Sequence, residues 1–249
     1  MSENGNIHIV SAWASQNNLT LGQVKTSEKS NEITAIPELL EYLLLEGNVI
    51  TIDAMGCQKD IAHKICEKGG DYILAVKENH PLLYDEVRSS FSIMKSEEFH
   101  PPVELDHGRI ETRNYYLISN LKHISKVNEW KNLNAIIMVD SERINKKTGE
   151  IQQEKRYFIS SLTNIEKVAT GIRSHWGIEN KLHWVLDVAM NEDKSAKRKN
   201  FAAQNFAMVN KLVLNMLKKD QRPISIRRKR KIAGWDPNYL WKILTLLSQ

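Results

Sequence analysis

Two short apolar runs separated by an amphipathic segment place the strongest limit on how this chain can fold. The runs are Asn48–Asp53 (NVITID) and Tyr72–Lys77 (YILAVK), and their shortness and β-branched residues favour buried strands over helices. Between them, the segment Lys59–Lys68 has apolar residues at helical spacing and is closed by two glycines. Strands that alternate with helices in this way predict a mixed α/β sheet in which the helices serve as crossovers.

The preceding and following segments extend this pattern. Ile7–Trp13 and Thr20–Lys25 have the composition of strands, and the turn residues between them predict an antiparallel hairpin. Helices are expected within residues 31–47, where Gly47 ends the apolar pattern, and over Pro81–Phe91.

From about residue 97 the sequence is typical of longer strands that form an antiparallel β insertion. These strands are Arg109–Asn120, Ala135–Asp140 and Gln153–Ser161. Helices are then expected over about Ile165–Met190, Ala196–Lys219 and Leu240–Leu247. The predicted organisation is an α/β core over residues 1–96, the β insertion over 97–162, core helices over 163–220 and a basic C-terminal tail over 221–249.

The segment Ile172–Asp193 carries the most distinctive chemistry in the sequence. On helical spacing His175, Glu179, His183 and Asp187 fall four apart on one face, while apolar residues line another face. An ordinary solvated stripe would explain these four residues equally well. Arginine, lysine and tryptophan side chains interleave the acidic position, however, and such a mixture suits a site for a metal ion and phosphate.

Charge and composition limit the kinds of partner that this chain is expected to bind. The chain carries 35 basic and 30 acidic side chains, for a net charge of +5, and two basic runs, Lys194–Lys199 and Arg222–Lys231, lie in its C-terminal third. Basic runs on both sides of the Glu179 segment favour a polyanionic partner over a merely solvated surface. The sequence shows no targeting segment and no apolar run long enough to span a membrane, and its two cysteines are expected to be reduced, which together predict a cytoplasmic protein.

Asp53 is a second candidate acid because it ends a predicted buried strand. Ligands of α/β sheets bind beyond the carboxyl ends of the strands, although an aspartate there can equally be a turn or helix cap. Two carboxylates brought together among lysines and arginines would suit Mg²⁺-dependent phosphoryl transfer, since Mg²⁺ prefers hard oxygen ligands. Glycosidases also use carboxylate pairs, but they would leave the basic runs unexplained.

Several blocks in the correct order resemble the H-repeat-associated, ISAs-type insertion-sequence transposases, which are similar to the DDE transposases. These blocks are Lys25–Leu40, Thr51–Ala62, Asp71–His80, Asp106–Arg113 and Arg173–Asp193. The resemblance implies a ribonuclease H-like core with flanking helices, a β insertion before the last acid, and two Mg²⁺ ions, or Mn²⁺ in their place.

The resemblance also implies roles for individual residues. Asp53 matches the second acid of the family's triad and Glu179 the third, so both are predicted catalytic residues and metal ligands. The first acid would lie on a core strand upstream of Ile7–Trp13, and that strand is expected to be missing from this sequence. Leu186 occupies the place of the lysine that related transposases carry seven residues after the glutamate. The residues expected near DNA are Lys77, His107, Arg109, Arg113, Arg173, His175, Trp176 and His183.

These residues lead to three functional hypotheses. The first is a DDE-type transposase of a bacterial insertion sequence, which acts at the nucleoid, binds DNA ends and catalyses Mg²⁺-dependent strand cleavage and transfer, inactive if the first acid is absent. The second is a non-catalytic DNA-binding remnant or an inhibitor of a full-length transposase. The third is a structure-selective nuclease on the same fold. A homodimer is left open in each case.

Overall fold

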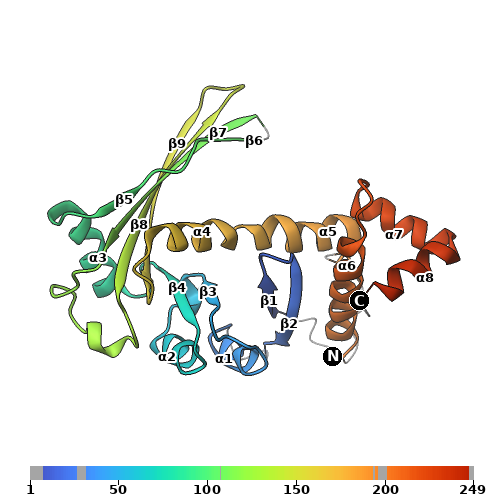
Figure 1. The fold of residues 1–249 in the computed structure, drawn as a ribbon, viewed down its shortest axis with the longest axis horizontal. Coiled ribbons are helices and arrows are strands. Elements are labelled where there is room, and N and C mark those ends of the chain that lie inside the picture. The colour runs from blue at the N-terminus through green and yellow to red at the C-terminus, as the bar shows by residue number, and fades with distance from the viewer. Residues whose placement is uncertain (1–7, 27–31, 107, 193, 196–200, 247–249) are drawn as a thin grey trace, which may run out of the picture. The chain divides into compact units, whose positions relative to one another are not determined.

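The computed structural model describes residues 8–26, 32–106, 108–192, 194–195 and 201–246. The chain divides into two units, one formed by residues 1–43 together with 176–249 and the other by residues 44–175. Each unit has its own cluster of buried apolar side chains. Figure 1 shows the helices and strands of the chain as a ribbon. Among the described residues, no helix is long and apolar enough to cross a bilayer.

A mixed sheet forms the centre of the unit over residues 44–175. Its strands run in the order β3-β4-β9-β8-β7-β5, and β6 pairs with β7. β3 and β4 are parallel and every other pairing is antiparallel. The strands are β3 (Val49–Ile52), β4 (Asp71–Val76), β5 (Glu97–Phe99), β6 (Glu104–Asp106), β7 (Arg109–Ile118), β8 (Ala135–Asn145) and β9 (Ile151–Ser160).

Helices flank this sheet. α4 (Ile165–His175) packs against β3, β4, β5 and β7, while α3 (Pro81–Ile93) packs against β8 and β9, and α2 (Lys59–Glu67) against β4. The backbone of α4 lies very close to the sheet at Gly171, where a Cβ atom would stand 2.7 Å from the side chain of Ile73. Two short 3-10 turns, η1 (Ala54–Gly56) and η2 (Val127–Glu129), complete this unit.

The other unit joins the two ends of the chain. It contains the antiparallel hairpin of β1 (Ile9–Ala14) and β2 (Leu19–Lys25), followed by α1 (Glu32–Glu41). Its remaining helices are the π-helix η3 (Glu179–His183), α5 (Trp184–Met190), α6 (Ala202–Lys219), α7 (Ile226–Trp235) and α8 (Pro237–Thr245).

Side chains of α6 hold the hairpin. The amide of Asn215 accepts from the backbone N–H of Thr20 at 3.0 Å and donates to its carbonyl at 2.9 Å, which copies the pairing of a neighbouring strand. The buried ammonium of Lys211 donates to Ser11 Oγ at 2.8 Å and to Gln23 Oε1 at 2.7 Å. Buried polar groups are normally hydrogen-bonded, and these hydrogen bonds satisfy the buried amide and ammonium groups of α6. They therefore hold β1 and β2 against α6.

Most of the elements expected from sequence are confirmed, including the α/β class with a mixed sheet flanked by helices. The differences have local causes. The C-terminal region was expected to hold one helix, over Leu240–Leu247, but the structure has two, because Ser225 caps α7 through its hydroxyl and the apolar side of α7 packs on the core of its unit. β9 also pairs with β4, so the strands of the predicted insertion continue the sheet that β3 and β4 begin. The four-part division of the chain stays a prediction.

Asp220 connects the last three helices. Its carboxylate is 1% exposed, accepts from the hydroxyl of Tyr239 at 2.8 Å and from Arg222 at 3.0 Å, and lies 3.8 Å from the ammonium of Lys229. Burial alone would raise the pKa of this carboxyl, but the hydrogen bonds from Tyr239 and Arg222 and the nearby positive charges lower it overall. The ionised carboxylate therefore stabilises the arrangement of α6, α7 and α8.

We expect Asp220→Ala to lower the free energy of unfolding by about 3 kcal/mol, since removing one partner leaves the buried charge of Lys229 without a carboxylate. The lowered pKa also predicts that this stabilisation is complete above the ordinary value of 3.8 and is lost as pH falls through the folded-state pKa. Urea unfolding followed by circular dichroism at several pH values measures both effects. Asp60→Ala, at an exposed position on α2, is the control and should change stability by less than about 0.5 kcal/mol.

Candidate functional site

Asp53 lies directly after β3, where the parallel pair β3–β4 ends. Its side chain is exposed and caps η1, accepting a long hydrogen bond of 3.5 Å from the N–H of Gly56. The cap role that sequence allowed is therefore real. Because the hydrogen bond is long and the carboxylate is open to solvent, its oxygens remain accessible to a ligand.

The loop after β4 supports the loop that carries Asp53. Asn79 donates from its side chain to the carbonyl of Ala54 at 2.7 Å, and the Nε2 atom of His80 lies 2.5 Å from the carbonyl oxygen of Cys57. Lys77, exposed at the end of β4, is at the same edge of the sheet as Asp53 since the two strands are parallel. The sheet edge thus presents a carboxylate and an ammonium on two mutually braced loops.

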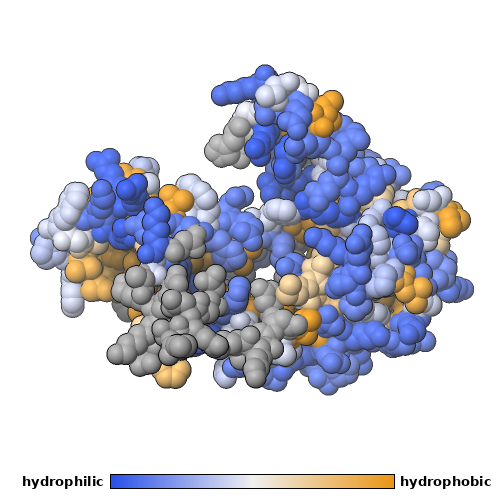
Figure 2. All heavy atoms as spheres, turned by 180° about the vertical axis from the view of Figure 1, so that it is seen from behind, coloured by the Kyte–Doolittle hydropathy of each residue, from blue (hydrophilic) through white to orange (hydrophobic). Residues whose placement is uncertain are grey.

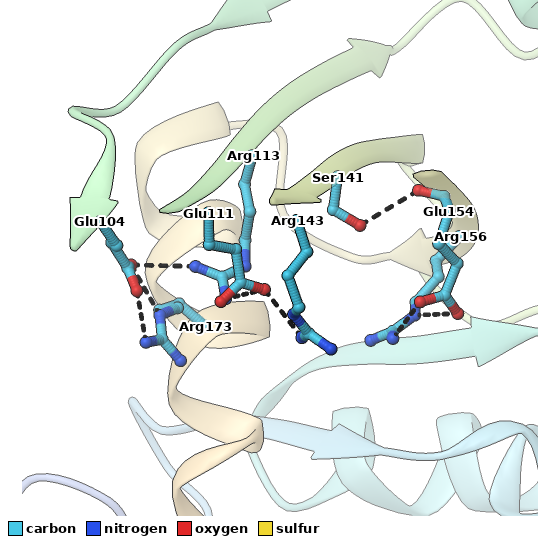
Figure 3. Close-up of polar contacts among 8 residues, drawn as sticks. All are labelled: Glu104, Glu111, Arg113, Ser141, Arg143, Glu154, Arg156 and Arg173. Carbon is cyan, nitrogen blue, oxygen red and sulfur yellow. Dashed lines mark hydrogen bonds and ion pairs between the residues drawn. The ribbon is translucent and has the colours of Figure 1, made fainter. Parts of the chain in front are cut away.

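A chain of ion pairs links α4 to three strands (Figure 3). The guanidinium of Arg173 binds Glu104 through two hydrogen bonds of 2.8 and 2.6 Å, and Arg113 lies 3.0 Å from the same carboxylate. Arg113 also lies 2.5 Å from Glu111, which in turn accepts from Arg143 at 3.0 Å. The hydrogen bonds from Arg173 lower the pKa of Glu104 despite its partial burial, so the Glu104 carboxylate is ionised and paired at neutral pH.

These pairs separate two arginines that the sequence had grouped together. The side chain of Arg113 is 13% exposed and has two carboxylate partners, so it stabilises the sheet. The side chain of Arg173 is 44% exposed and keeps part of its guanidinium open to solvent. Arg109 is exposed and lines a pocket of about 150 Å³ with Arg143, Asn145, Glu150 and Gln152. His107 lies outside the described residues.

In the sequence, the division between the two units falls between His175 and Trp176. The Nδ1 atom of His175, the last residue of α4, lies 3.0 Å from the hydroxyl of Thr51 on β3, two residues before Asp53. This bond ties the end of α4 to the strand that carries the acid. Trp176 belongs to the other unit and is 39% exposed.

Glu179 is the first residue of a π-helix, which the sequence pattern did not predict. The N–H of Trp184 donates to the carbonyl of Glu179, which closes a turn one residue wider than in an α-helix. The expectation of a single α-helical stripe from His175 to Asp187 is therefore wrong, because the wider turn interrupts the spacing. Glu179 and His183 still meet, with 3.4 Å between Oε1 and Nδ1, and the side chain of Glu179 is 61% exposed.

Lys218, on α6, supports this π-helix and was missed from sequence. Its ammonium donates to the carbonyl of Lys181 at 2.6 Å, inside the π-helix, and lies 4.0 Å from the ring centroid of Trp13. Burial, together with the charge of Lys181, lowers the pKa of Lys218 to about 8. No motif marks this lysine, since its partners come from segments far away in the chain.

The donor atoms of the two candidate acids suit a divalent ion that prefers oxygen. Within the described ranges, however, no three His, Cys, Asp or Glu side chains gather into a group that could hold a metal ion. Asp53 belongs to one unit and Glu179 to the other. The structure thus presents two accessible carboxylates, each on its own supporting framework.

The similarity of this chain to a known family defines the class of protein. The chain belongs to the family described as Transposase DDE domain, whose model matches residues 4–216.

Individual relatives agree with this class. YbfL and YhhI of Escherichia coli strain K12 are each 42% identical to the chain over 250 residues, and YncI of Escherichia coli O157:H7 is 43% identical over 256 residues. YhhI is named as a candidate transposase associated with the H repeat, and YncI as a candidate transposase. The alignments cover 96%, 96% and 98% of this chain but 66%, 66% and 65% of the relatives, so the chain spans just under two thirds of their length. The H-repeat-associated resemblance is confirmed.

The lowered pKa of Lys218 predicts how stability depends on pH. The unfolded chain holds this proton up to about 10.5, while the folded chain releases it near 8, so between these values the unfolded state binds more protons and the free energy of unfolding rises with pH. Lys218→Met removes this contribution. We therefore expect the wild-type advantage in unfolding free energy to grow between pH 8 and 10.5, as measured by urea titration at each pH.

Lys95→Met, at an exposed lysine after α3, is the matched control and should show a difference from wild type that is independent of pH. A pH-independent difference for Lys218→Met as well would contradict the burial of its ammonium against the π-helix.

Proposed function

We propose that this chain carries part of the catalytic machinery of a DDE-type transposase, in which Asp53 and Glu179 are metal ligands and the substrate is the DNA end of an insertion sequence. The reaction would be metal-dependent strand cleavage and transfer. The observation that carries the proposal is the family match over residues 4–216, which includes both acids. The exposed position of Asp53 at the carboxyl end of β3 supports its part in it.

The donor chemistry fits Mg²⁺ or Mn²⁺. Both ions prefer carboxylate oxygens, and Asp53 and Glu179 each offer an exposed carboxylate. A bound ion of this kind would supply charge stabilisation for the attacking and leaving oxygens of phosphoryl transfer. The protein would hold its own groups in place by hydrogen bonds. Asn79 and His80 contact the loop that carries Asp53, and Lys218 binds a carbonyl of the π-helix that begins at Glu179.

DNA contacts would come from basic and aromatic side chains around the acids. Lys77 and Arg109 are exposed and suit phosphate oxygens, and Arg173 could exchange Glu104 for a phosphate. Trp176 offers an exposed ring for stacking on an unpaired base. His175 contacts Thr51, close to Asp53, and His183 contacts Glu179. The main role of these two histidines would therefore be to position the acids, and DNA contact would be secondary. Arg113 and His107 remain further candidates.

The second candidate function is DNA binding without catalysis, by a protein that is either a remnant or an inhibitor of a longer transposase. The observation in its favour is that the described residues bring no third metal-binding side chain to Asp53 or to Glu179. In either case the partner would be bacterial nucleoid DNA in the cytoplasm. A homodimer is the assembly to examine by sedimentation.

Nicking of supercoiled DNA by the purified chain, with Mg²⁺ or Mn²⁺, distinguishes these functions. The catalytic function predicts nicking that falls by about 100-fold or more in Asp53→Asn and in Glu179→Gln, because each change removes a charged ligand without altering side-chain size. Asp60→Asn and Glu38→Gln, at exposed positions outside the candidate site, are the matched controls and should retain wild-type rates.

Calorimetry in the same preparations measures metal binding independently of cleavage. Binding that weakens in both acid variants but not in the controls would support the ligand roles. Folded protein that binds DNA without tight metal binding or nicking would favour the non-catalytic function. Nicking that survives Glu179→Gln would show that the assignment of this acid is wrong.

A further inference from the structure

We propose that the exposed side of α7 binds the sugar–phosphate backbone of duplex DNA. This surface, the α7 basic face, consists of Arg227, Arg228, Lys231 and Trp235. It lies beyond residue 216, where the match to the transposase domain ends. The inference rests on the proposed function only in taking DNA as the partner, and it assigns a contact surface that is separate from the two acids.

The charge of the chain is concentrated in this region. Residues 221–249 hold seven basic side chains and a single acidic one, Asp236, whereas the preceding 220 residues hold 28 basic and 29 acidic side chains. All of the net positive charge of the protein therefore comes from its last 29 residues. A local excess of this kind attracts a polyanion, while the rest of the chain is close to neutral.

The helical geometry of α7 sorts its residues onto two sides. Ile226, Ile232 and Ala233 pack against the core cluster of their unit, and Lys229 is buried beside Asp220. At 100° per residue, the members of the α7 basic face fall within about a quarter of the helix circumference, on the other side. In Figure 2 the surface over α7, at the upper left, is mainly hydrophilic, while an apolar patch lies over α8.

The other cations of the region have structural contacts: three pair with Asp220, and the half-buried Arg230 lies 3.7 Å from Met190 Sδ. Arg222, Lys229 and Lys242 all lie within 4 Å of the Asp220 carboxylate. Arg227, Arg228 and Lys231 are exposed, and none of them pairs with a carboxylate in the part of the chain that the structure describes. Exposed cations without a protein partner, presented by a helix that is fixed from beneath, are suited to phosphate contacts.

DNA fits this surface better than an anionic membrane does. A membrane-surface helix needs a broad apolar side to insert below the headgroups, but the isoleucines of α7 are turned into the core of the protein. Trp235, 75% exposed, is the one large apolar side chain on the α7 basic face. A tryptophan beside arginines can lie against the deoxyribose and reinforce phosphate contacts, so the surface should bind duplex DNA with little sequence preference.

The salt dependence of binding by the full chain tests this proposal. Fluorescence anisotropy with a labelled 30-base-pair duplex of arbitrary sequence, in EDTA to exclude cleavage, gives the apparent Kd between about 50 and 300 mM salt. For the triple variant Arg227→Gln, Arg228→Gln, Lys231→Gln we expect affinity to fall by about 10-fold or more at the lowest salt. The slope of log affinity against log salt is negative, and its magnitude should decrease by about 2 to 3, since each lost phosphate contact contributes about 0.9.

The control makes the same change of net charge elsewhere. Lys95→Gln, Lys122→Gln, Lys167→Gln removes three exposed lysines from the unit over residues 44–175 and should leave the slope within about 0.5 of wild type. Circular dichroism verifies that both variants are folded. These six positions are surface side chains, so both variants are expected to keep wild-type stability.

Equal losses in the two triple variants would overturn the proposal, since binding would then follow net charge alone. Absence of DNA binding by the wild type would overturn it as well, as would binding of α7 to phosphatidylglycerol vesicles in place of DNA. Failure of nicking with the slope effect intact would reject the catalytic function and leave the α7 basic face standing. Nicking that depends on Asp53, together with an unchanged slope in the α7 triple variant, would support the catalytic function and reject the α7 basic face as a DNA-binding surface.

Discussion

The position of β4 between β3 and β9 is the constraint on which the sheet of residues 44–175 depends. β4 pairs in parallel with β3 on one side and antiparallel with β9 on the other, and most of its side chains are fully buried. The parallel pair brings Asp53 and Lys77 to one edge, and the antiparallel pair ties the long strands β7, β8 and β9 to that edge. A backbone hydrogen-bond ladder, rather than any side-chain cluster, therefore determines where the candidate acid stands.

The sequence predicted the elements that local patterns define. β3, β4 and α2 follow from apolar spacing and glycine stops, and Asp53 follows from its place at a strand end. The pairing of β4 with β9 could not be predicted, because it joins segments more than 80 residues apart and no local pattern encodes such a partner. The helix α7 was also missed, because its charged residues hide the few apolar positions that pack inward.

The assignment of Asp53 and Glu179 as site acids stays a prediction, and the ion pairs around them could not be predicted from the sequence. A sequence shows an arginine, but it does not show whether a carboxylate already holds it. Glu104 comes 69 residues before Arg173, yet the pair forms two hydrogen bonds, and Arg113 is held between two glutamates. The π-helix at Glu179 was equally hidden, since its residues suit an ordinary α-helix and the wider turn is seen only in the backbone hydrogen bond from Trp184 to Glu179.

The contacts of α6 with the β1–β2 hairpin have a consequence for how the protein is made. Asn215 pairs with Thr20 across 195 residues, so the hairpin leaves the ribosome long before the helix that completes it has been translated. Until then its strands have no neighbour on that side, and unpaired strand edges are sites of aggregation. A nascent chain that stops before Ala202 would lack α6 and would leave this side of the hairpin uncovered, with a strand edge open to aggregation.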